Sequence, residues 1–325
     1  MSGADATFRA MGSEIRLIVG EGGLDPVDAV AAAKGFIEDF EQCLSRFRPD
    51  SELCALNAYV GDVVPASPLL RDAVAAGIAA AERTGGLVDP TLVGAIEDAG
   101  YVDSREGAVP VDLRTALLMA PGRAPARPDP ARRWAMIEVD ESAGVIRRPV
   151  GVRFDSGGIG KGLAADLLAE RLAGQTRFVI GCGGDLRVGG TLPDRQEVLV
   201  EHPITGAQDQ RIFLEDGAVA TSGINVRVWR REDGRYAHHL IDPRTGEPAW
   251  TGLVGATALA PTGVEAETVA KAALLSGPDG AREILREHGG VIFHEDGEAE
   301  PIGPIGLEPR LTVRVPATLE KEVAA

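Results

Sequence analysis

The segment Phe154-Asp-Ser-Gly-Gly-Ile-Gly-Lys-Gly-Leu-Ala-Ala-Asp166 carries four glycines, one lysine and two acids where an apolar run passes into a helical pattern. Glycines let a backbone approach a ligand closely, and the first turn of a helix has N–H groups without intrahelical partners. The segment therefore predicts either a site for an anionic ligand or a structural strand-to-helix turn. It matches neither the dinucleotide fingerprint GxGxxG nor the phosphate loop GxxxxGK[ST].

Helical and extended patterns alternate on both sides of this segment. Apolar residues at three- and four-residue spacing predict helices over residues 27–47, 69–83, 161–173, 264–275 and 279–287. Extended patterns cover residues 7–19, a strand pair within 135–152, and short strands at 177–180, 197–200, 211–214, 236–241, 253–259, 291–293 and 311–315. This mixture predicts an α+β (mixed α/β) fold rather than a doubly wound parallel sheet. We expect one domain over residues 1–315 and a disordered tail over residues 316–325.

Composition excludes several classes of protein. Acidic residues outnumber basic ones by 49 to 33 in a chain of 325 residues, which argues against a nucleic-acid partner. No uncharged apolar stretch reaches about 18 residues, so we expect no membrane span. The N-terminal residues lack the basic and apolar regions of a signal peptide, and the three cysteines are widely spaced. Both features predict a cytoplasmic protein with reduced thiols.

Further motifs surround the glycine-rich segment in a fixed order. They are Ala10-Met-Gly-Ser-Glu14, Ser45-Arg-Phe-Arg-Pro-Asp-Ser-Glu-Leu53 with Asn57, Val88-Asp-Pro-Thr91, Gly183-Gly-Asp185, Ala220-Thr-Ser-Gly223 and His239-Leu-Ile-Asp-Pro-Arg-Thr-Gly246. Set in this order, the motifs resemble the ApbE family of FAD:protein FMN transferases. The resemblance runs from about Phe8 to about Gly277, and the motif that begins at His239 is its strongest part.

The resemblance implies one α/β unit that holds flavin in a cleft, and it assigns roles to individual residues. Asp155 and Lys161 fall at flavin-contacting positions, and the Gly158 carbonyl oxygen falls at a Mg²⁺ ligand. The other flavin-contacting positions that it implies are Met11, Phe47, Val88, Asp89 and Ile241. Residue type alone also allows ordinary structural roles. Asp155 can cap a turn and Asp89 can form an Asx turn. The four apolar residues can belong to the hydrophobic core.

His239 is the candidate general base, because a neutral imidazole accepts a proton from a hydroxyl at pH 7. Asp242 is the second catalytic candidate, as the group that orients His239 or holds the surroundings of the metal. Strand alternation puts the two side chains on opposite faces, so their contact requires a bend at Pro243.

The chain departs from the family in the last motif. The family there has an Asp followed four residues later by Thr or Ser, both of which bind Mg²⁺, whereas this chain has Glu267 and Lys271. Glu267 can still ligate Mg²⁺, but an ammonium has no lone pair to offer. Lys271 can instead lie in the cation site or form an i,i+4 pair with Glu267. Magnesium is therefore an uncertain cofactor, whereas FAD is expected.

The resemblance predicts a Mg²⁺-dependent enzyme that moves FMN from FAD to a Thr or Ser hydroxyl of an acceptor flavoprotein and releases AMP. Two alternatives stay open, because the departure at Glu267 and Lys271 affects catalysis more than flavin binding. One is a FAD pyrophosphatase, in which water is the acceptor. The other is a flavin-binding relative without catalytic activity.

Overall fold

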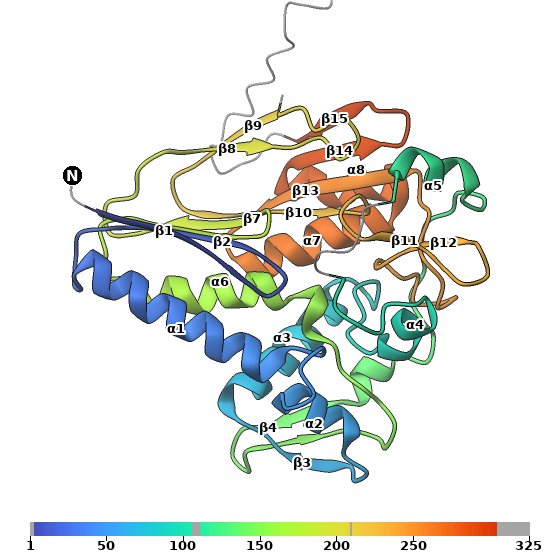
Figure 1. Ribbon diagram of the computed structural model, residues 1–325, viewed down its shortest axis with the longest axis horizontal. Coiled ribbons are helices and arrows are strands. Elements are labelled where there is room, and N and C mark those ends of the chain that lie inside the picture. The colour runs from blue at the N-terminus through green and yellow to red at the C-terminus, as the bar shows by residue number, and fades with distance from the viewer. Residues whose placement is uncertain (1–2, 106–110, 209, 304–325) are drawn as a thin grey trace, which may run out of the picture.

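A computed structural model of the protein describes residues 3–105, 111–208 and 210–303 (Figure 1). Its largest element is an eight-stranded sheet in which every neighbouring pair is antiparallel. In spatial order the strands are β1 (Gly3–Ala10), β2 (Ser13–Gly20), β6 (Phe178–Cys182), β7 (Asp185–Gly189), β10 (Gly217–Gly223), β13 (Leu253–Ala260), β14 (Gly290–His294) and β15 (Ala299–Ile302).

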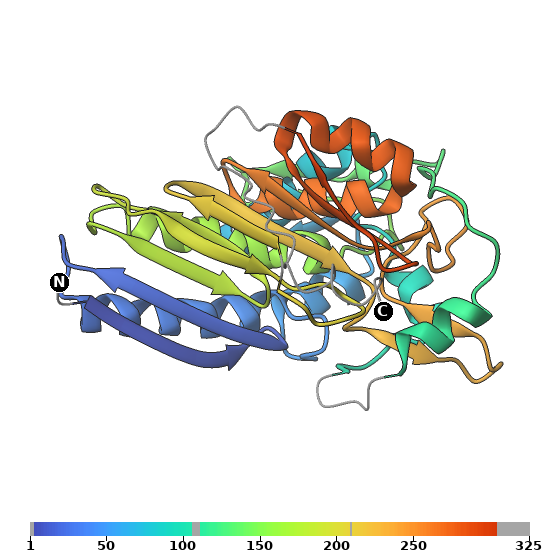
Figure 2. The same ribbon diagram turned by 90° about the horizontal axis from the view of Figure 1, so that it is seen from above.

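Four helices cover one face of this sheet. They are α1 (Pro26–Leu44), α6 (Gly160–Arg171), α7 (Gly263–Leu275) and α8 (Gly277–His288). They pack in that order against successive strands, from β1 to β15 (Figure 2). Every residue of β13 is buried, because α7 and α8 pack against this interior strand and Pro203 lies close to its Gly255. The main hydrophobic core therefore lies between the sheet and these helices.

Smaller elements complete the fold. The helices are α2 (Glu52–Ala58), α3 (Pro68–Arg83), α4 (Val93–Asp98) and α5 (Leu113–Met119), with 3-10 turns η1 (Arg133–Met136) and η2 (Ser156–Gly158). A small sheet contains β3 (Val63–Pro65), β5 (Val145–Arg147) and β4 (Glu138–Asp140). Two hairpins pair β8 (Gln196–Val200) with β9 (Gln210–Leu214), and β11 (Val228–Arg230) with β12 (Tyr236–His238). Figure 1 shows α2 and the small sheet at the end of the molecule away from β8 and β9.

The helices α6 and α7 fix each other's N-termini. Asp166 of α6 accepts hydrogen bonds from the N–H groups of Gly263 (2.7 Å) and Val264 (2.9 Å) at the start of α7. Glu267 of α7 in return accepts from the N–H of Gly162 at 2.9 Å. The helices approach so closely that a Cβ on Gly162 would lie 2.4 Å from the carbonyl carbon of Gly263. These contacts hold the glycine-rich segment, which enters α6, in one position.

The mixed α/β character predicted from the sequence is confirmed, but two predicted segments are wrong. Residues 7–19 are not one extended segment, because Met11 (φ 52°) and Gly12 (φ 64°) form a two-residue hairpin turn between β1 and β2. The strand predicted over residues 236–241 ends at His238, and Ile241 forms only an isolated bridge with Pro248. The interior strands β7 and β10 were not predicted. The expected strand at 311–315 and the expected tail at 316–325 lie outside the described residues.

Within the described ranges, no helix combines the length and the apolar composition needed to cross a bilayer.

Candidate active site

A cavity of about 610 Å³ opens beside the glycine-rich segment. Its lining includes the β1–β2 turn, the chain between α1 and α2, the loops before and after α4, the glycine-rich segment, the chain before β11, the segment after β12, and α7. The lining contains all seven residues predicted to contact flavin, together with Gly158 and His239. Asp242 and Glu267 do not belong to it. The structure thus brings together residues that are up to 230 positions apart in the sequence, from Met11 to Ile241.

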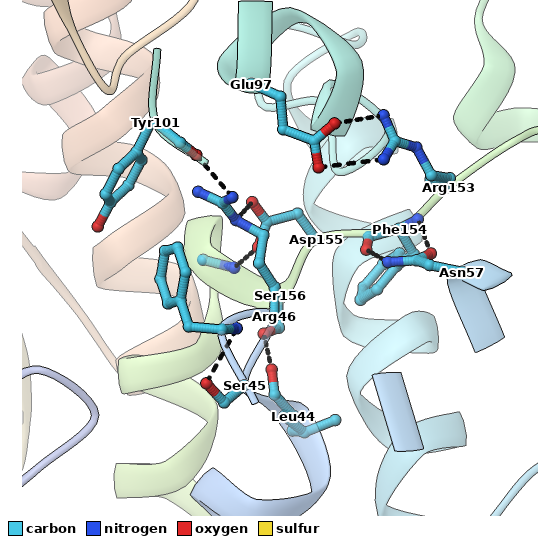
Figure 3. A network of polar contacts seen from close by, with 12 residues as sticks. Leu44, Ser45, Arg46, Asn57, Glu97, Tyr101, Arg153, Phe154, Asp155 and Ser156 are labelled. Carbon is cyan, nitrogen blue, oxygen red and sulfur yellow. Dashed lines mark hydrogen bonds and ion pairs between the residues drawn. The ribbon is translucent and has the colours of Figure 1, made fainter. Parts of the chain in front are cut away.

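The start of the glycine-rich segment is tied to its neighbours by polar contacts (Figure 3). Phe154 exchanges two hydrogen bonds of 2.8 Å with the side chain of Asn57, and the Ser156 hydroxyl donates to the carbonyl oxygen of Leu44 at 3.1 Å. The Asp155 carboxylate accepts from the N–H of Gly157 at 2.9 Å. Asp155 therefore caps the turn, as one reading of the sequence expected, and it also lines the cavity.

Arg46 links Asp155 to an aromatic wall. Its guanidinium lies 3.2 Å from the Asp155 carboxylate and donates to the carbonyl oxygen of Tyr101 at 2.8 Å (Figure 3). It also lies 4.3 Å from the ring centroid of Phe47 and 4.7 Å from that of Tyr101. The rings of Phe47 and Tyr101 are 5.3 Å apart, and Trp229 lies 5.5 Å beyond Tyr101. Flat apolar surface of this kind is suited to a planar ligand.

Positive charge also lines the cavity at Lys161. The Lys161 ammonium lies 2.5 Å from the carboxylate of Asp185, which also accepts from the N–H of Thr221 at 3.0 Å. Burial disfavours the charged lysine, but the carboxylates of Asp185 and Glu267 outweigh burial and raise the pKa of Lys161. Lys161 is therefore a cation at neutral pH, with its charge at the start of α6.

Two further cations, Lys271 and Arg227, line the cavity as well. Lys271 projects from α7 toward the glycine-rich segment, where its Cε lies 3.9 Å from the position of a Cβ on Gly158. Arg227 precedes β11, and among residues 3–105, 111–208 and 210–303 it has no hydrogen bond or ion pair. These groups meet at the cavity surface from three different parts of the chain.

His239 faces these cations. Burial lowers the pKa of His239 well below its usual range, and the charges of Arg227, Lys271 and Lys161 lower it further. Its Nδ1 atom is buried and has no hydrogen-bond partner in the part of the chain that the structure describes. His239 is therefore neutral at pH 7, and able to accept a proton.

Asp242 lies in the turn that follows His239 and has a different environment. Its carboxylate accepts hydrogen bonds from the N–H groups of Arg127 (2.9 Å) and Arg244 (3.0 Å), and its carbonyl oxygen accepts from Gly246. The bend at Pro243 does not bring Asp242 to His239, because the carboxylate is directed to these backbone donors. Asp242 thus stabilises the loop that carries His239 and Ile241.

The remaining predicted residues form the walls of the cavity. Met11 lies in the β1–β2 turn, Val88 and Ile241 are buried, and all three line the cavity. Asp89 accepts hydrogen bonds from the N–H (2.7 Å) and hydroxyl (2.6 Å) of Thr91, so it forms the Asx turn that residue type alone suggested. Burial raises the pKa of Asp89.

The residues at the expected metal position do not fit a magnesium ion. Glu267 is only 3% exposed, and its oxygens contact the N–H of Gly162 (2.9 Å) and the ammonium of Lys271 (3.6 Å). A metal ion there would replace one of these contacts and meet the charge of Lys271. No cluster of three or more His, Cys, Asp or Glu residues suited to a metal exists in the described residues. Within the described residues, the surroundings of Glu267 and Lys271 thus offer Mg²⁺ neither a set of oxygen ligands nor a negative field.

Sequence reasoning assigned no role to Arg46, Tyr101, Asp185 or Arg227. Arg46 and Asp185 lie inside the motifs at residues 45–53 and 183–185. The alternation of arginine and phenylalanine at residues 46–48 is a signal for a guanidinium stacked on a ring. Tyr101 and Arg227 have no local signal, because only tertiary packing brings them to the cavity.

Comparison with known proteins identifies similar sequences. The model of the ApbE family matches residues 11–293. A FAD:protein FMN transferase of Treponema pallidum is 30% identical over 272 residues, which cover 78% of this chain and 73% of that protein. A protein of the same name from Escherichia coli K12 is 25% identical over 268 residues, which cover 78% of this chain and 72% of that protein.

Solved structures share the fold. The ApbE protein of Thermotoga maritima matches with a TM-score of 0.76 at 24% identity, over 93% of this chain and 97% of that one. The flavin transferase ApbE of Vibrio cholerae matches with a TM-score of 0.69 at 21% identity, over 92% of this chain and 96% of that one. At these identities the two structures are evidence for the fold alone.

Proposed function

This chain belongs to the ApbE family, as its motifs predicted, and we propose on that premise that it is a FAD:protein FMN transferase. It takes FAD as substrate, transfers FMN to a Thr or Ser hydroxyl of an acceptor protein, and releases AMP. The relatives named above carry this activity in their names.

The observation that carries the proposal is the composition of the cavity. FAD combines a flat isoalloxazine ring with two phosphates, so its site needs an apolar wall and cations in one cavity. Here the wall of Phe47 and Tyr101 and the cations Lys161, Arg227 and Lys271 line the same cavity, joined by the glycine-rich segment. In this proposal Phe47, Met11, Val88 and Ile241 contact the ring, and Asp155 keeps Arg46 in place against Phe47 and Tyr101.

Transfer begins when the acceptor hydroxyl oxygen attacks the phosphorus of the FMN half of FAD. The new oxygen–phosphorus bond forms as the bond to the bridging oxygen breaks, and AMP leaves with that oxygen. His239 accepts the hydroxyl proton and later returns it to solvent. The low pKa of His239 makes it a weak base. Bound phosphates bring negative charge, raise that pKa and strengthen the base.

Two finer assignments follow from the contacts. Asp242 acts as a positioning residue, because its carboxylate holds the loop on which His239 lies. Magnesium has no step in this mechanism, because Gly158 and Glu267 do not form a site for it together with Lys271. A cytoplasmic location stays a prediction that cell fractionation can test.

The test mixes the purified protein with FAD and peptides that each contain one Thr or Ser. Matched peptides in which Val replaces the Thr, or Ala replaces the Ser, are the controls. Each mixture is run with EDTA and, separately, with Mg²⁺. Mass spectrometry then detects peptide-bound FMN, and chromatography measures AMP.

Peptide-bound FMN together with AMP, absent from the Val and Ala controls, is the expected result. Free FMN with AMP in every mixture would identify a FAD pyrophosphatase instead. Unchanged FAD under all conditions, with tight binding of FAD, would identify a flavin-binding protein without transferase activity.

A further inference from the structure

Two lysine–carboxylate pairs lie side by side at the cavity. Lys161 and Lys271 both line it, while their partners Asp185 and Glu267 are buried behind them at 4% and 3% exposure. Each carboxylate also accepts a backbone hydrogen bond, Asp185 from Thr221 and Glu267 from Gly162. Both carboxylates are thus fixed in the fold, and they hold the two ammonium groups at the cavity surface.

Lys271 is placed to reach a ligand on the glycine-rich segment. Its side chain is 13% exposed, and its Cε lies 3.9 Å from the position of a Cβ on Gly158. An ammonium has three N–H donors, and the contact with Glu267 at 3.6 Å uses at most one. The other donors remain for an anion that binds at the glycine-rich segment.

The balance of charge also favours an anion. The cations Lys161, Lys271 and Arg227 exceed the carboxylates Asp185 and Glu267 by one charge. Arg227 has no ion pair within the described part of the chain, so its charge is not neutralised there. The pyrophosphate of FAD carries one negative charge on each phosphate and would complete this arrangement. A divalent cation would meet an excess of positive charge.

We propose that Lys271 takes the place of a divalent metal ion at the FAD pyrophosphate, so that this protein binds and uses FAD without a metal. The inference rests on the proposed function only in that FAD is the ligand. Glu267 holds the ammonium where it would otherwise hold the ion, and Lys161 and Arg227 supply the remaining positive charge.

The test compares wild type with Lys271→Thr, after EDTA treatment, in FAD titrations followed by flavin fluorescence. Lys34→Thr is the matched control, because Lys34 forms an i,i+4 pair with Glu38 on the exposed side of α1, away from the cavity. Each titration is repeated with millimolar Mg²⁺, and calorimetry measures Mg²⁺ binding directly.

We expect wild type and Lys34→Thr to bind FAD equally well with EDTA and with Mg²⁺, and to give no calorimetric signal for Mg²⁺. Lys271→Thr should bind FAD about 10- to 100-fold more weakly in EDTA, because it loses a charge-assisted contact. Mg²⁺ should restore most of this loss, since the substitution supplies a hydroxyl beside Glu267 and removes the competing charge.

A second variant separates loss of FAD affinity from misfolding that an unpaired Glu267 carboxylate would cause. Lys271→Met with Glu267→Gln removes both charges and keeps a hydrogen-bond acceptor for Gly162. It should fold, bind FAD as weakly as Lys271→Thr in EDTA, and gain nothing from Mg²⁺.

Wild-type binding of FAD that falls tenfold or more in EDTA would overturn the inference, as would unchanged FAD affinity in both Lys271 variants. If wild type releases AMP only when Mg²⁺ is added, the claim that the protein uses FAD without a metal is overturned. Failure of the transferase proposal looks different: no peptide-bound FMN forms, while metal-free binding of FAD still depends on Lys271. That outcome would leave this inference supported.

Discussion

Replacement of Lys161 by Met tests whether the glycine-rich segment binds phosphates. Lys161 lines the cavity, and its ammonium lies 2.5 Å from the buried Asp185 carboxylate. The substitution removes a charge-assisted contact to FAD that is worth about 1.5–3 kcal/mol, so the dissociation constant should rise about 10- to 150-fold. Riboflavin has no phosphate, and its affinity should change by less than about threefold.

The same substitution also weakens the fold, because Asp185 becomes a buried carboxylate without its partner. Removal of one partner from a buried ion pair costs about 3–5 kcal/mol of the free energy of unfolding. Lys161→Met combined with Asp185→Asn removes both charges and should recover much of this stability. The double variant separates the two effects, since it should fold well and still bind FAD weakly.

Fluorescence titrations with FAD and riboflavin, together with urea unfolding, measure both effects in wild type and the two variants. The reasoning is refuted if the double variant binds FAD as tightly as wild type. It is also refuted if FAD and riboflavin lose affinity equally, because Lys161 would then act on the ring or the fold and not on the phosphates.

Three further predictions concern the base, the buried histidine and the ring. His239→Gln should lower the single-turnover rate of FMN transfer by about 10²-fold with FAD affinity nearly unchanged, and full activity would place the base elsewhere. His238 is fully buried, and burial lowers its pKa from 6.5 to about 3. As the pH drops below 6.5, His238 is protonated in the unfolded state but not in the folded state, so the free energy of unfolding falls. His238→Phe should therefore reduce the loss of unfolding free energy between pH 7.5 and 5 by about 2 kcal/mol, measured by urea unfolding; an equal loss in both proteins would contradict this. Phe47→Ala should lower the affinities for FAD and for riboflavin alike by about tenfold in the same titrations. A loss of affinity confined to FAD would contradict the contact of Phe47 with the isoalloxazine ring.

Local chemistry explains why part of the site was predictable. Asp89 and Asp155 form turn contacts with residues two positions away, and Glu267 meets Lys271 one helical turn later. Such contacts depend on sequence spacing, so residue types in order are enough to indicate them. The same holds for the helix over residues 161–173, which the structure gives as Gly160–Arg171.

Predictions failed where distant contacts decide the conformation. Sequence alternation continues through Met11 and Gly12, but pairing of β1 with β2 requires a reversal there. The role of Asp242 stays a prediction, and its carboxylate accepts both from the nearby N–H of Arg244 and from the N–H of Arg127, 115 residues earlier, a contact that sequence spacing does not indicate.

The sequence by itself determined the family and the mixed α/β class, because ordered motifs specify local turns and helix starts. It also indicated nine residues that line the cavity. Tertiary structure alone decided the charge of the site. Lys161 meets Asp185 across 24 residues, and Arg227 reaches the same cavity from the chain before β11. Electrostatic interactions depend on distance in space and on burial, and neither quantity can be read from sequence order.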